Sequence, residues 1–302
     1  MIIDALVRFW SGPEQLGPEL SRRVRGLGVG VAGPLDASAD AIQRAIAPLG
    51  GAFVMGLRAQ GIHASVPNDV LADAIRRAGG RLLGASGIDP TAPGAMAEFE
   101  HARSLGLLGV CVSPSTQQFH PTHSAALKLF ARCEELGVPV FASRPGPIVQ
   151  SAVLEFDRPA AWDEVLRNCP RLRLVVGEMG WPWIDEAVAL SAKHPGVFLA
   201  TDGLASRPWP LYTSLLTAAS VGALDRVLFA SGFPFESPSR AVESLYSLGA
   251  LAQSVQLPAL PRASIRSIVE RDAFQALGIS AVAPPPATLS GSFGFAMPRG
   301  HS

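Results

Sequence analysis

The chain has 302 residues, 48% of them hydrophobic, so it has enough apolar material for a large core, and this excludes disorder for most of its length. Its 25 lysines and arginines balance 25 aspartates and glutamates, so the chain lacks the basic field that attracts nucleic acid or an anionic membrane. We therefore expect a small molecule as its partner. Charged residues make up only 17% of the chain, below the roughly 25% of an average protein, which favours a homodimer.

No apolar run approaches the ~20 residues of a membrane span or shows a signal-peptide pattern, so a cytoplasmic protein is expected. The cysteines form no CxxC pair, and this spacing favours reduced, structural thiols over a zinc site. They are Cys111, Cys133 and Cys169. The two lysines, Lys128 and Lys193, fall in helical patterns, so we expect no Schiff-base lysine on a central strand.

Apolar or β-branched runs alternate with helical stretches through most of the chain, a pattern typical of βαβ units around a parallel sheet. The predicted strands are Ile2–Arg8, Ala52–Leu57, Arg81–Ile88, Leu108–Ser113, Val138–Ser143, Leu172–Glu178, Gly196–Thr201 and Arg226–Ser231. The predicted helices are Asn68–Ala78, Pro93–Leu105, Ser124–Leu136, Pro159–Asn168, Trp183–His194, Leu211–Val221, Ser237–Leu248 and a closing helix, Ser264–Leu277. Eight such units predict a (β/α)8 TIM barrel, whose usual size is about 250 residues.

A doubly wound open sheet is the alternative fold, because Gly28–Gly33 spells GxGxxG. The preceding run Arg22–Arg25 is not a buried strand and Pro34 follows at once, so we expect no dinucleotide and no other cofactor. Residues 1–280 are predicted to form a single barrel domain, and residues 281–302 a tail rich in Pro, Gly and Ser. This tail is either a disordered end or a segment that contacts a neighbouring subunit or covers the barrel mouth.

Two motifs that follow predicted strands are the most specific in the chain: Val176–Trp183, VGEMGWPW, and Val227–Phe235, VLFASGFPF. Weaker matches are Met1–Arg8, Asn68–Leu71, Arg81–Pro90, Pro139–Phe141 and Asp185–Ala187. Together they resemble the amidohydrolase-related family of metal-dependent TIM barrels, which includes aminocarboxymuconate semialdehyde decarboxylase, related decarboxylases and lactone hydrolases. The resemblance extends over nearly the whole chain and implies a site at the C-terminal ends of the strands.

The metal ligands that the resemblance implies are missing from this chain. Where the family has His-x-His on the first strand, a histidine on the fifth and on the sixth, and an aspartate on the eighth, this chain has Leu6, Arg8, Ser143, Glu178 and Gly232. One carboxylate facing an arginine does not suit an ion that needs about three or four ligands. Of the histidines, His120 and His123 have a spacing that could bind metal, but such a lone pair is usually a surface feature. We expect no metal.

The matched strand ends predict a remodelled mouth with an aromatic wall, of the kind that binds planar ligands. Its predicted catalytic residues are Glu178, Arg8 and Ser143. Its predicted substrate-binding residues are Arg144, Trp10, Ser113, Phe119, Trp181, Asp202, Ser231, Phe233 and Phe235. Because no serine lies in a GxSxG turn or has an evident histidine partner, we do not expect a serine-hydrolase triad.

Two interpretations of Glu178 remain open. Desolvation among aromatic rings favours a protonated carboxyl group, whereas a nearby guanidinium favours an ionised carboxylate that acts as a base. In the second case Arg8 or Arg144 would bind a carboxylate, phenolate or enolate of the substrate. Alternatively, Arg8 and Glu178 form a buried ion pair that fills the place of the lost metal, and the aromatic residues are core.

Three classes of function follow. The first is a metal-independent enzyme of specialised metabolism that acts on a small aromatic or polyketide-like carbonyl compound by enolisation with cyclisation, dehydration or decarboxylation. The second is a non-catalytic binding or partner protein derived from a hydrolase. The third is a metal-dependent hydrolase or decarboxylase with its ligands elsewhere. The polar and aromatic residues gathered at the strand ends favour the first.

Overall fold

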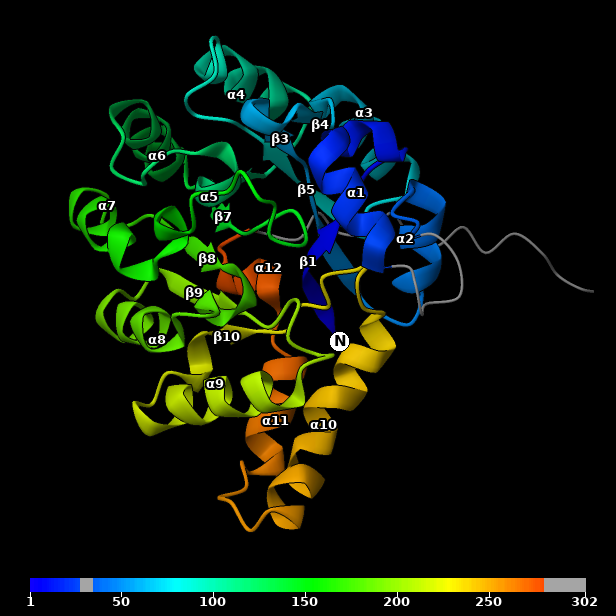
Figure 1. Ribbon diagram of the computed structural model, residues 1–302, viewed down its shortest axis with the longest axis vertical. Coiled ribbons are helices and arrows are strands. Elements are labelled where there is room, and N and C mark those ends of the chain that lie inside the picture. The colour runs from blue at the N-terminus through cyan, green and yellow to red at the C-terminus, as the bar shows by residue number, and fades with distance from the viewer. Residues whose placement is uncertain (28–34, 280–302) are drawn as a thin grey trace, which may run out of the picture.

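The protein is described by a computed structural model, which covers residues 1–27 and 35–279. Its eight parallel strands stand in the order β1-β2-β5-β6-β7-β8-β9-β10, with helices around them (Figure 1). They are β1 (Ile3–Arg8), β2 (Gly51–Met55), β5 (Leu82–Gly87), β6 (Gly109–Val112), β7 (Val140–Ala142), β8 (Leu174–Val176), β9 (Val197–Ala200) and β10 (Val227–Leu228). This confirms the TIM barrel; the Gly28–Gly33 motif and the 281–302 tail lie outside the described residues.

The barrel closes between β1 and the segment that follows β10. Backbone hydrogen bonds cross this seam from Ala5 N to Phe229 O (2.9 Å), Gly232 N to Leu6 O (3.0 Å) and Arg8 N to Phe233 O (2.8 Å). The pairing register of β1 shifts between Asp4 and Val7, where a β-bulge interrupts the ladder. Asp4 Oδ1 accepts the backbone N–H groups of Leu6 (3.2 Å) and Ser231 (3.0 Å), so its side chain links β1 to the segment that follows β10.

The helices outside the strands are α1 (Gly17–Leu27), α2 (Ala39–Ala45), α3 (Asn68–Arg77), α4 (Ala95–Ser104), α5 (Pro114–Gln117), α6 (Ser124–Leu136), α7 (Trp162–Asn168), α8 (Ile184–Lys193), α9 (Pro208–Ser220), α10 (Pro238–Ser254), α11 (Arg262–Val269) and α12 (Ala273–Ala276). Short 3-10 turns are η1 (Pro13–Leu16), η2 (Gln60–Ile62), η3 (Leu154–Asp157), η4 (Pro159–Ala161), η5 (Gly177–Gly180) and η6 (Leu224–Arg226). A small hairpin joins β3 (Arg58–Ala59) to β4 (Ala64–Ser65). No helix of the described segments combines the length and apolarity that a membrane span requires.

The chain after α10 differs from the prediction. Where a single closing helix was expected over Ser264–Leu277, the structure has two helices, α11 and α12, because the carboxylate of Asp272 caps α12 by accepting the N–H groups of Phe274 (2.9 Å) and Gln275 (3.0 Å). Phe274 packs edge-on against Phe53 with 5.2 Å between ring centroids. Together with Leu277 it belongs to the core inside the barrel, so α12 closes the end at which the strands begin.

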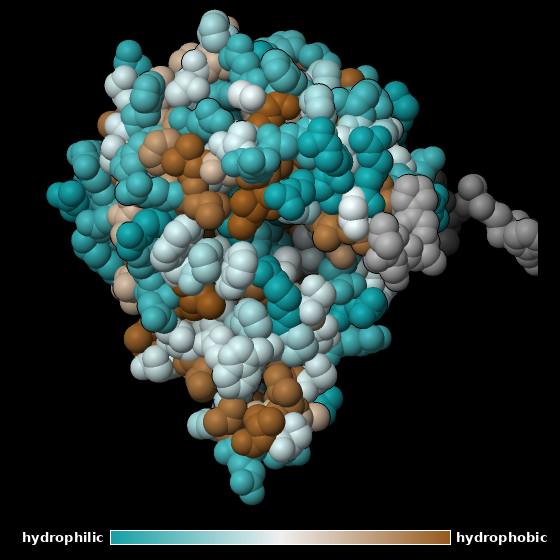
Figure 2. Space-filling model, viewed as in Figure 1, coloured by the Kyte–Doolittle hydropathy of each residue, from teal (hydrophilic) through white to brown (hydrophobic). Residues whose placement is uncertain are grey.

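The strands separate two apolar cores. On β2, Phe53 and Met55 point into the barrel, whereas Ala52 and Val54 pack against the surrounding helices, as the two-residue period of a strand requires. The visible outer surface is mostly polar, with apolar residues near the lower end of the view, where the segment between α10 and α11 lies (Figure 2). In that segment Val255 and Leu257 are exposed. The homodimer stays a prediction.

Candidate active site

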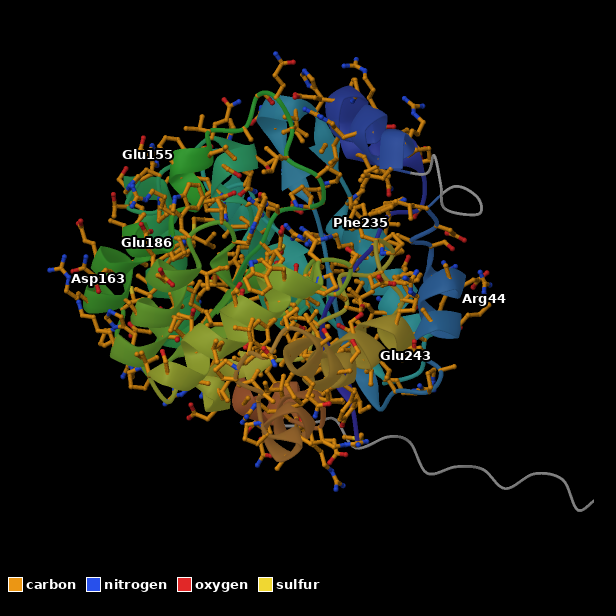
Figure 3. All side chains as sticks on the ribbon, turned by 60° about the horizontal axis from the view of Figure 1, so that its bottom comes forward. Arg44, Glu155, Asp163, Glu186, Phe235 and Glu243 are labelled. Carbon is orange, nitrogen blue, oxygen red and sulfur yellow. The ribbon has the colours of Figure 1, made fainter. Side chains whose placement is uncertain are left out.

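A cleft of about 520 Å³, open to solvent, lies at the C-terminal ends of the strands. Arg8 and Glu178 both line it, as the resemblance of their strand ends implied. Three further arginines contribute to its walls: Arg23, Arg144 and Arg207. Glu178 is the one carboxylate among the described residues that line the cleft, so its walls carry an excess of positive charge. Phe235, labelled in Figure 3, forms part of the wall, whereas Arg44 lies on the periphery.

Arg8 forms its ion pair with Asp202. Its Nη2 lies 3.0 Å from Asp202 Oδ2 and 3.1 Å from Ser143 Oγ, and all three residues are buried. The other oxygen of Asp202, Oδ1, accepts the backbone N–H of Glu178 (2.8 Å). Burial raises the pKa of the Asp202 carboxyl, and the Arg8 charge partly opposes this shift. The predicted buried pair of Arg8 with Glu178 is therefore wrong: the side chain that ends β1 reaches the loop after β9 instead.

Glu178 is held between two other guanidinium groups. Its Oε1 lies 2.8 Å from Nη2 of Arg144, and its Oε2 lies 2.7 Å from Nη2 of Arg207. The backbone of Glu178 has φ 51° and ψ 27°, a left-handed conformation that non-glycine residues rarely adopt and that is found preferentially at functional sites. Gly203 lies against this side chain, because a Cβ at its position would be 3.1 Å from Glu178 Cγ. The carboxylate is thus fixed between two guanidinium groups at the wall of the cleft.

Trp181 and Asp157 complete the surroundings of Arg144. The guanidinium carbon of Arg207 lies 4.4 Å from the centre of the Trp181 ring and that of Arg144 lies 5.7 Å away, distances that give cation–π attraction. Arg144 Nη2 also donates to the carbonyl oxygen of Trp181 (3.2 Å). On its other side, Nη1 of Arg144 is 3.6 Å from Asp157 Oδ2, and burial raises the pKa of Asp157. The aromatic ring is therefore placed by the same arginines that hold Glu178.

A smaller space, here called the inner pocket, adjoins the cleft at Arg8. Its lining includes Arg8, Trp10, Met55, Cys111, Ser113, Gln117 and Ser143. Trp10 is buried, with its ring 6.1 Å from that of Phe235, so these two aromatic residues connect the pocket with the cleft wall. Burial raises the pKa of the Cys111 thiol to about 12, so this thiol stays protonated and unreactive. Of the predicted site residues, Trp10, Ser113 and Ser143 belong to this pocket.

Other predicted residues lie away from both spaces. Ser231 is fully buried at the barrel seam, where its N–H bonds to Asp4 and its Oγ accepts the N–H of Phe233 (3.0 Å). Phe119 is buried in the core between barrel and helices. Asp202 lies beneath the cleft and contacts the residues that line it. Phe233 is partly buried and packs against the outer core.

Sequence reasoning missed Arg207, Arg23 and Asp157. Arg207 precedes α9, and Arg23 lies on α1. No helix or strand was predicted in the region of α1. No motif marks these positions, and a spacing pattern cannot show which side chains turn toward a strand end. Leu20 and Val24 of α1 stand at i and i+4 and are buried. This apolar pair is the feature of the sequence that could have indicated the helix that carries Arg23.

The fold and the strand-end site define a TIM-barrel protein of the amidohydrolase type. The sequence profile of the amidohydrolase family matches residues 10–273, so the chain belongs to this family. No curated protein sequence matches the chain.

Several solved structures share the fold. An uncharacterised TIM-barrel protein from Bordetella bronchiseptica is 22% identical, with a TM-score of 0.71, and the match covers 92% of this chain and 98% of that chain. A dihydroxybenzoic acid decarboxylase from a Polaromonas species, solved with manganese and the inhibitor 2-nitroresorcinol, is 16% identical, with a TM-score of 0.62 and coverage of 92% and 96%. A probable 2-pyrone-4,6-dicarboxylic acid hydrolase from Acinetobacter baumannii is 12% identical, with a TM-score of 0.62 and coverage of 92% and 99%.

The residues at the strand ends do not fit a divalent metal ion. Among the described residues, no three His, Cys, Asp or Glu side chains come together as a ligand group. The two carboxylates nearest the place of the family's metal, Asp202 and Glu178, already pair with guanidinium groups, and Arg8 contributes a fixed positive charge there. This charge would repel a second cation, since a metal site needs several unprotonated donors that face one point.

Proposed function

We propose that the chain is a metal-independent enzyme of specialised metabolism that acts on a small aromatic or polyketide-like carbonyl compound by acid–base chemistry. Cyclisation, dehydration and decarboxylation are the reactions that such chemistry allows. The arginine-rich cleft supports an anionic substrate or intermediate. Two of the similar structures are named for acids built on a ring, a dihydroxybenzoic acid and a pyrone dicarboxylic acid, which is in keeping with a ligand of this kind.

The observation that carries the proposal is the position of Glu178. Its carboxylate faces the cleft, its side chain is only 14% exposed, and both oxygens are held by guanidinium groups. The left-handed backbone at this residue is the kind of strained conformation that a surrounding structure maintains for a function. Trp181 beside it offers a planar apolar surface for a ring.

In the proposed reaction, Glu178 removes a proton from the carbon next to the substrate's carbonyl group. The C–H bond breaks, an O–H bond forms on the carboxylate, and the electron pair moves through the new C=C bond to the carbonyl oxygen, which becomes an enolate. A guanidinium of the site stabilises this negative charge. When the enolate attacks a second carbonyl of the same substrate or expels a leaving group, Glu178 returns its proton, so the step needs no oxidant and no metal.

The decisive experiment is the substitution Glu178→Gln, which preserves shape and removes the proton acceptor. We expect turnover per folded molecule to fall roughly 10²- to 10⁴-fold. Turnover is measured on a panel of polycarbonyl compounds and hydroxybenzoates by the change in product mass, alongside the melting temperature. The exposed Glu155, replaced by Gln, is the matched control and should retain full turnover. Unchanged turnover in folded Glu178→Gln protein would eliminate Glu178 as the base.

A second candidate function is a non-catalytic binding protein. It is favoured by the ion pairs of the site, because both oxygens of Glu178 are paired and Arg8 is paired with Asp202. Ion pairs of this kind are also expected where the residues have only a structural role. This candidate predicts that Glu178→Gln lowers the melting temperature, since removing one partner leaves buried charge uncompensated, with no turnover to lose in either protein.

A further inference from the structure

The walls of the cleft carry four guanidinium groups, and three of them have carboxylate partners. The pairs are Arg8 with Asp202 (3.0 Å), Arg144 with Glu178 (2.8 Å) and with Asp157 (3.6 Å), and Arg207 with Glu178 (2.7 Å). The fourth guanidinium, that of Arg23, forms no ion pair within residues 1–27 and 35–279, and the rest of the chain contains no aspartate or glutamate. Three carboxylates thus offset three guanidinium groups, and one positive charge of the cleft wall is left over.

Glu19 stands one turn before Arg23 on α1, but its carboxylate is engaged elsewhere. Its Oε1 accepts the backbone N–H of Ser151 (3.0 Å), and its Oε2 accepts the hydroxyl of Ser151 (2.7 Å). The hydroxyl of Ser151 is also the main cause that lowers the pKa of Glu19, and the charge of Arg23 contributes less. Arg23 is exposed and lines the cleft, so its guanidinium is accessible to a ligand there.

The cleft wall on the side of α1 is apolar. Its members are Leu27, Pro147, Ile148 and Phe235. The loop after β7 is packed closely against α1, because a Cβ at Gly146 would lie 2.8 Å from Cζ of Phe235 and 3.4 Å from Cδ1 of Leu20. Leu27, one turn after Arg23, is nevertheless 49% exposed. The unpaired charge therefore stands beside an apolar surface that a ligand can cover.

Arg23 and Glu178 line the same cleft but form no ion pair with each other, so one ligand can contact both. The cleft of about 520 Å³ lies within the range of small-molecule sites. A guanidinium binds a carboxylate best, through two parallel N–H groups, and the side chain of Arg23 offers such a pair.

We propose that Arg23 binds a carboxylate of the substrate. The body of the substrate lies along the apolar wall, and its carbonyl group reaches Glu178. The substrate class is thus a keto acid in which a ring separates the carboxylate from the enolisable carbon. This inference rests on the proposed function in taking Glu178 as the base.

The test measures binding and needs no turnover. The probe is 4-acetylbenzoate, whose ring separates a carboxylate from a methyl ketone, and the neutral analogue of nearly the same shape is 4-acetylbenzamide. Affinities are read from titrations followed by the NMR signals of the ligand. We expect the carboxylate to bind roughly fivefold more tightly than the amide, at the upper end of what a partly solvated ion pair contributes. Equal affinity for the two compounds, or no saturable binding of 4-acetylbenzoate at millimolar concentration, overturns the proposal.

Variants then locate the carboxylate. Arg23→Gln changes an exposed position of α1, so the fold should persist, and we expect the fivefold preference to disappear while the affinity for the amide stays unchanged. The matched control is Arg22→Gln, which removes the same charge from the neighbouring position, exposed but outside the cleft, and should keep the preference. Retention of the preference in Arg23→Gln protein, or an equal loss in Arg22→Gln protein, overturns the assignment to Arg23.

Failure of this inference is distinguishable from failure of the proposed function. Glu178→Gln protein should keep at least the wild-type preference for the carboxylate, because the variant leaves Arg23 in place and removes a negative charge from the cleft. A preference that depends on Arg23, together with turnover that does not depend on Glu178, would retain the carboxylate site and eliminate the proposed base. Turnover that depends on Glu178 without any preference for the carboxylate would do the reverse.

Discussion

Asp4 is fully buried at the barrel seam, and its Oδ2 has no hydrogen-bond partner among the described residues. Burial raises the pKa of this carboxyl from 3.8 to about 7, against the opposing effect of the hydrogen bonds from Ser231 and Leu6. The folded protein therefore holds a proton that the unfolded chain releases near pH 4. The stabilisation by Asp4 is complete below pH 4 and is lost as the pH rises from about 4 to about 7.

We expect Asp4→Asn, which is neutral at every pH, to remove this dependence. Between about pH 4 and pH 7 the wild-type protein should lose up to about 1.4 kcal/mol of unfolding free energy per pH unit relative to the variant. Urea unfolding at pH 5 and pH 8 measures the difference. The exposed Glu243, changed to Gln, is the control (Figure 3). Equal pH slopes for wild type and Asp4→Asn would show that Asp4 ionises normally in the folded protein.

The predictability of the site differs from residue to residue. Arg8, Ser143 and Glu178 could be placed at the mouth because each ends a strand, and parallel strands bring their ends together. Their partners could not be predicted, because Arg8 and Asp202 are 194 positions apart and an ion pair depends on which way each side chain turns. Arg207 was missed for the same reason.

The turn between α11 and α12 positions the element that closes the barrel floor. Asp272 caps α12, so Asp272→Ala leaves two N–H groups without their acceptor. We expect the free energy of unfolding to fall by about 1 kcal/mol, read as a lower melting temperature. Asp272→Asn keeps an oxygen acceptor and should remain close to wild type. If Asp272→Asn lowers the melting temperature as much as Asp272→Ala does, the stabilisation comes from the carboxylate charge and not from the capping hydrogen bonds.

Elements with strong local signals were predicted most closely. The helix α6 has the predicted bounds, Ser124–Leu136, because His123 caps its start and Gly137, with φ 66°, ends it. The predicted strands are longer than the observed ones, since their ends become loops that carry site residues. No helix or strand was predicted over residues 9–50, although Leu20 and Val24 of α1 stand on one apolar face of that helix.

For the molecule as a whole, the donor set predicts independence from divalent metal. We expect elemental analysis to find no stoichiometric zinc, manganese or iron in purified protein, and ligand binding and activity to persist after treatment with a chelator. The physical reason is that the two carboxylates at this place already pair with guanidinium groups, Asp202 with Arg8 and Glu178 with Arg144. About one metal ion per chain, lost together with activity on chelation, would contradict this expectation.

The positive charge of Arg8 belongs to a side chain and not to a bound ion, and this difference determines when the charged site forms. A bound ion has to be acquired after synthesis, can be exchanged for a competitor and is lost by dilution, whereas a guanidinium arrives with the polypeptide and is in place once β1 pairs with its neighbours. Maturation then coincides with folding. If the protein is the metal-independent enzyme proposed above, the supply of trace elements in the cell does not limit its active fraction.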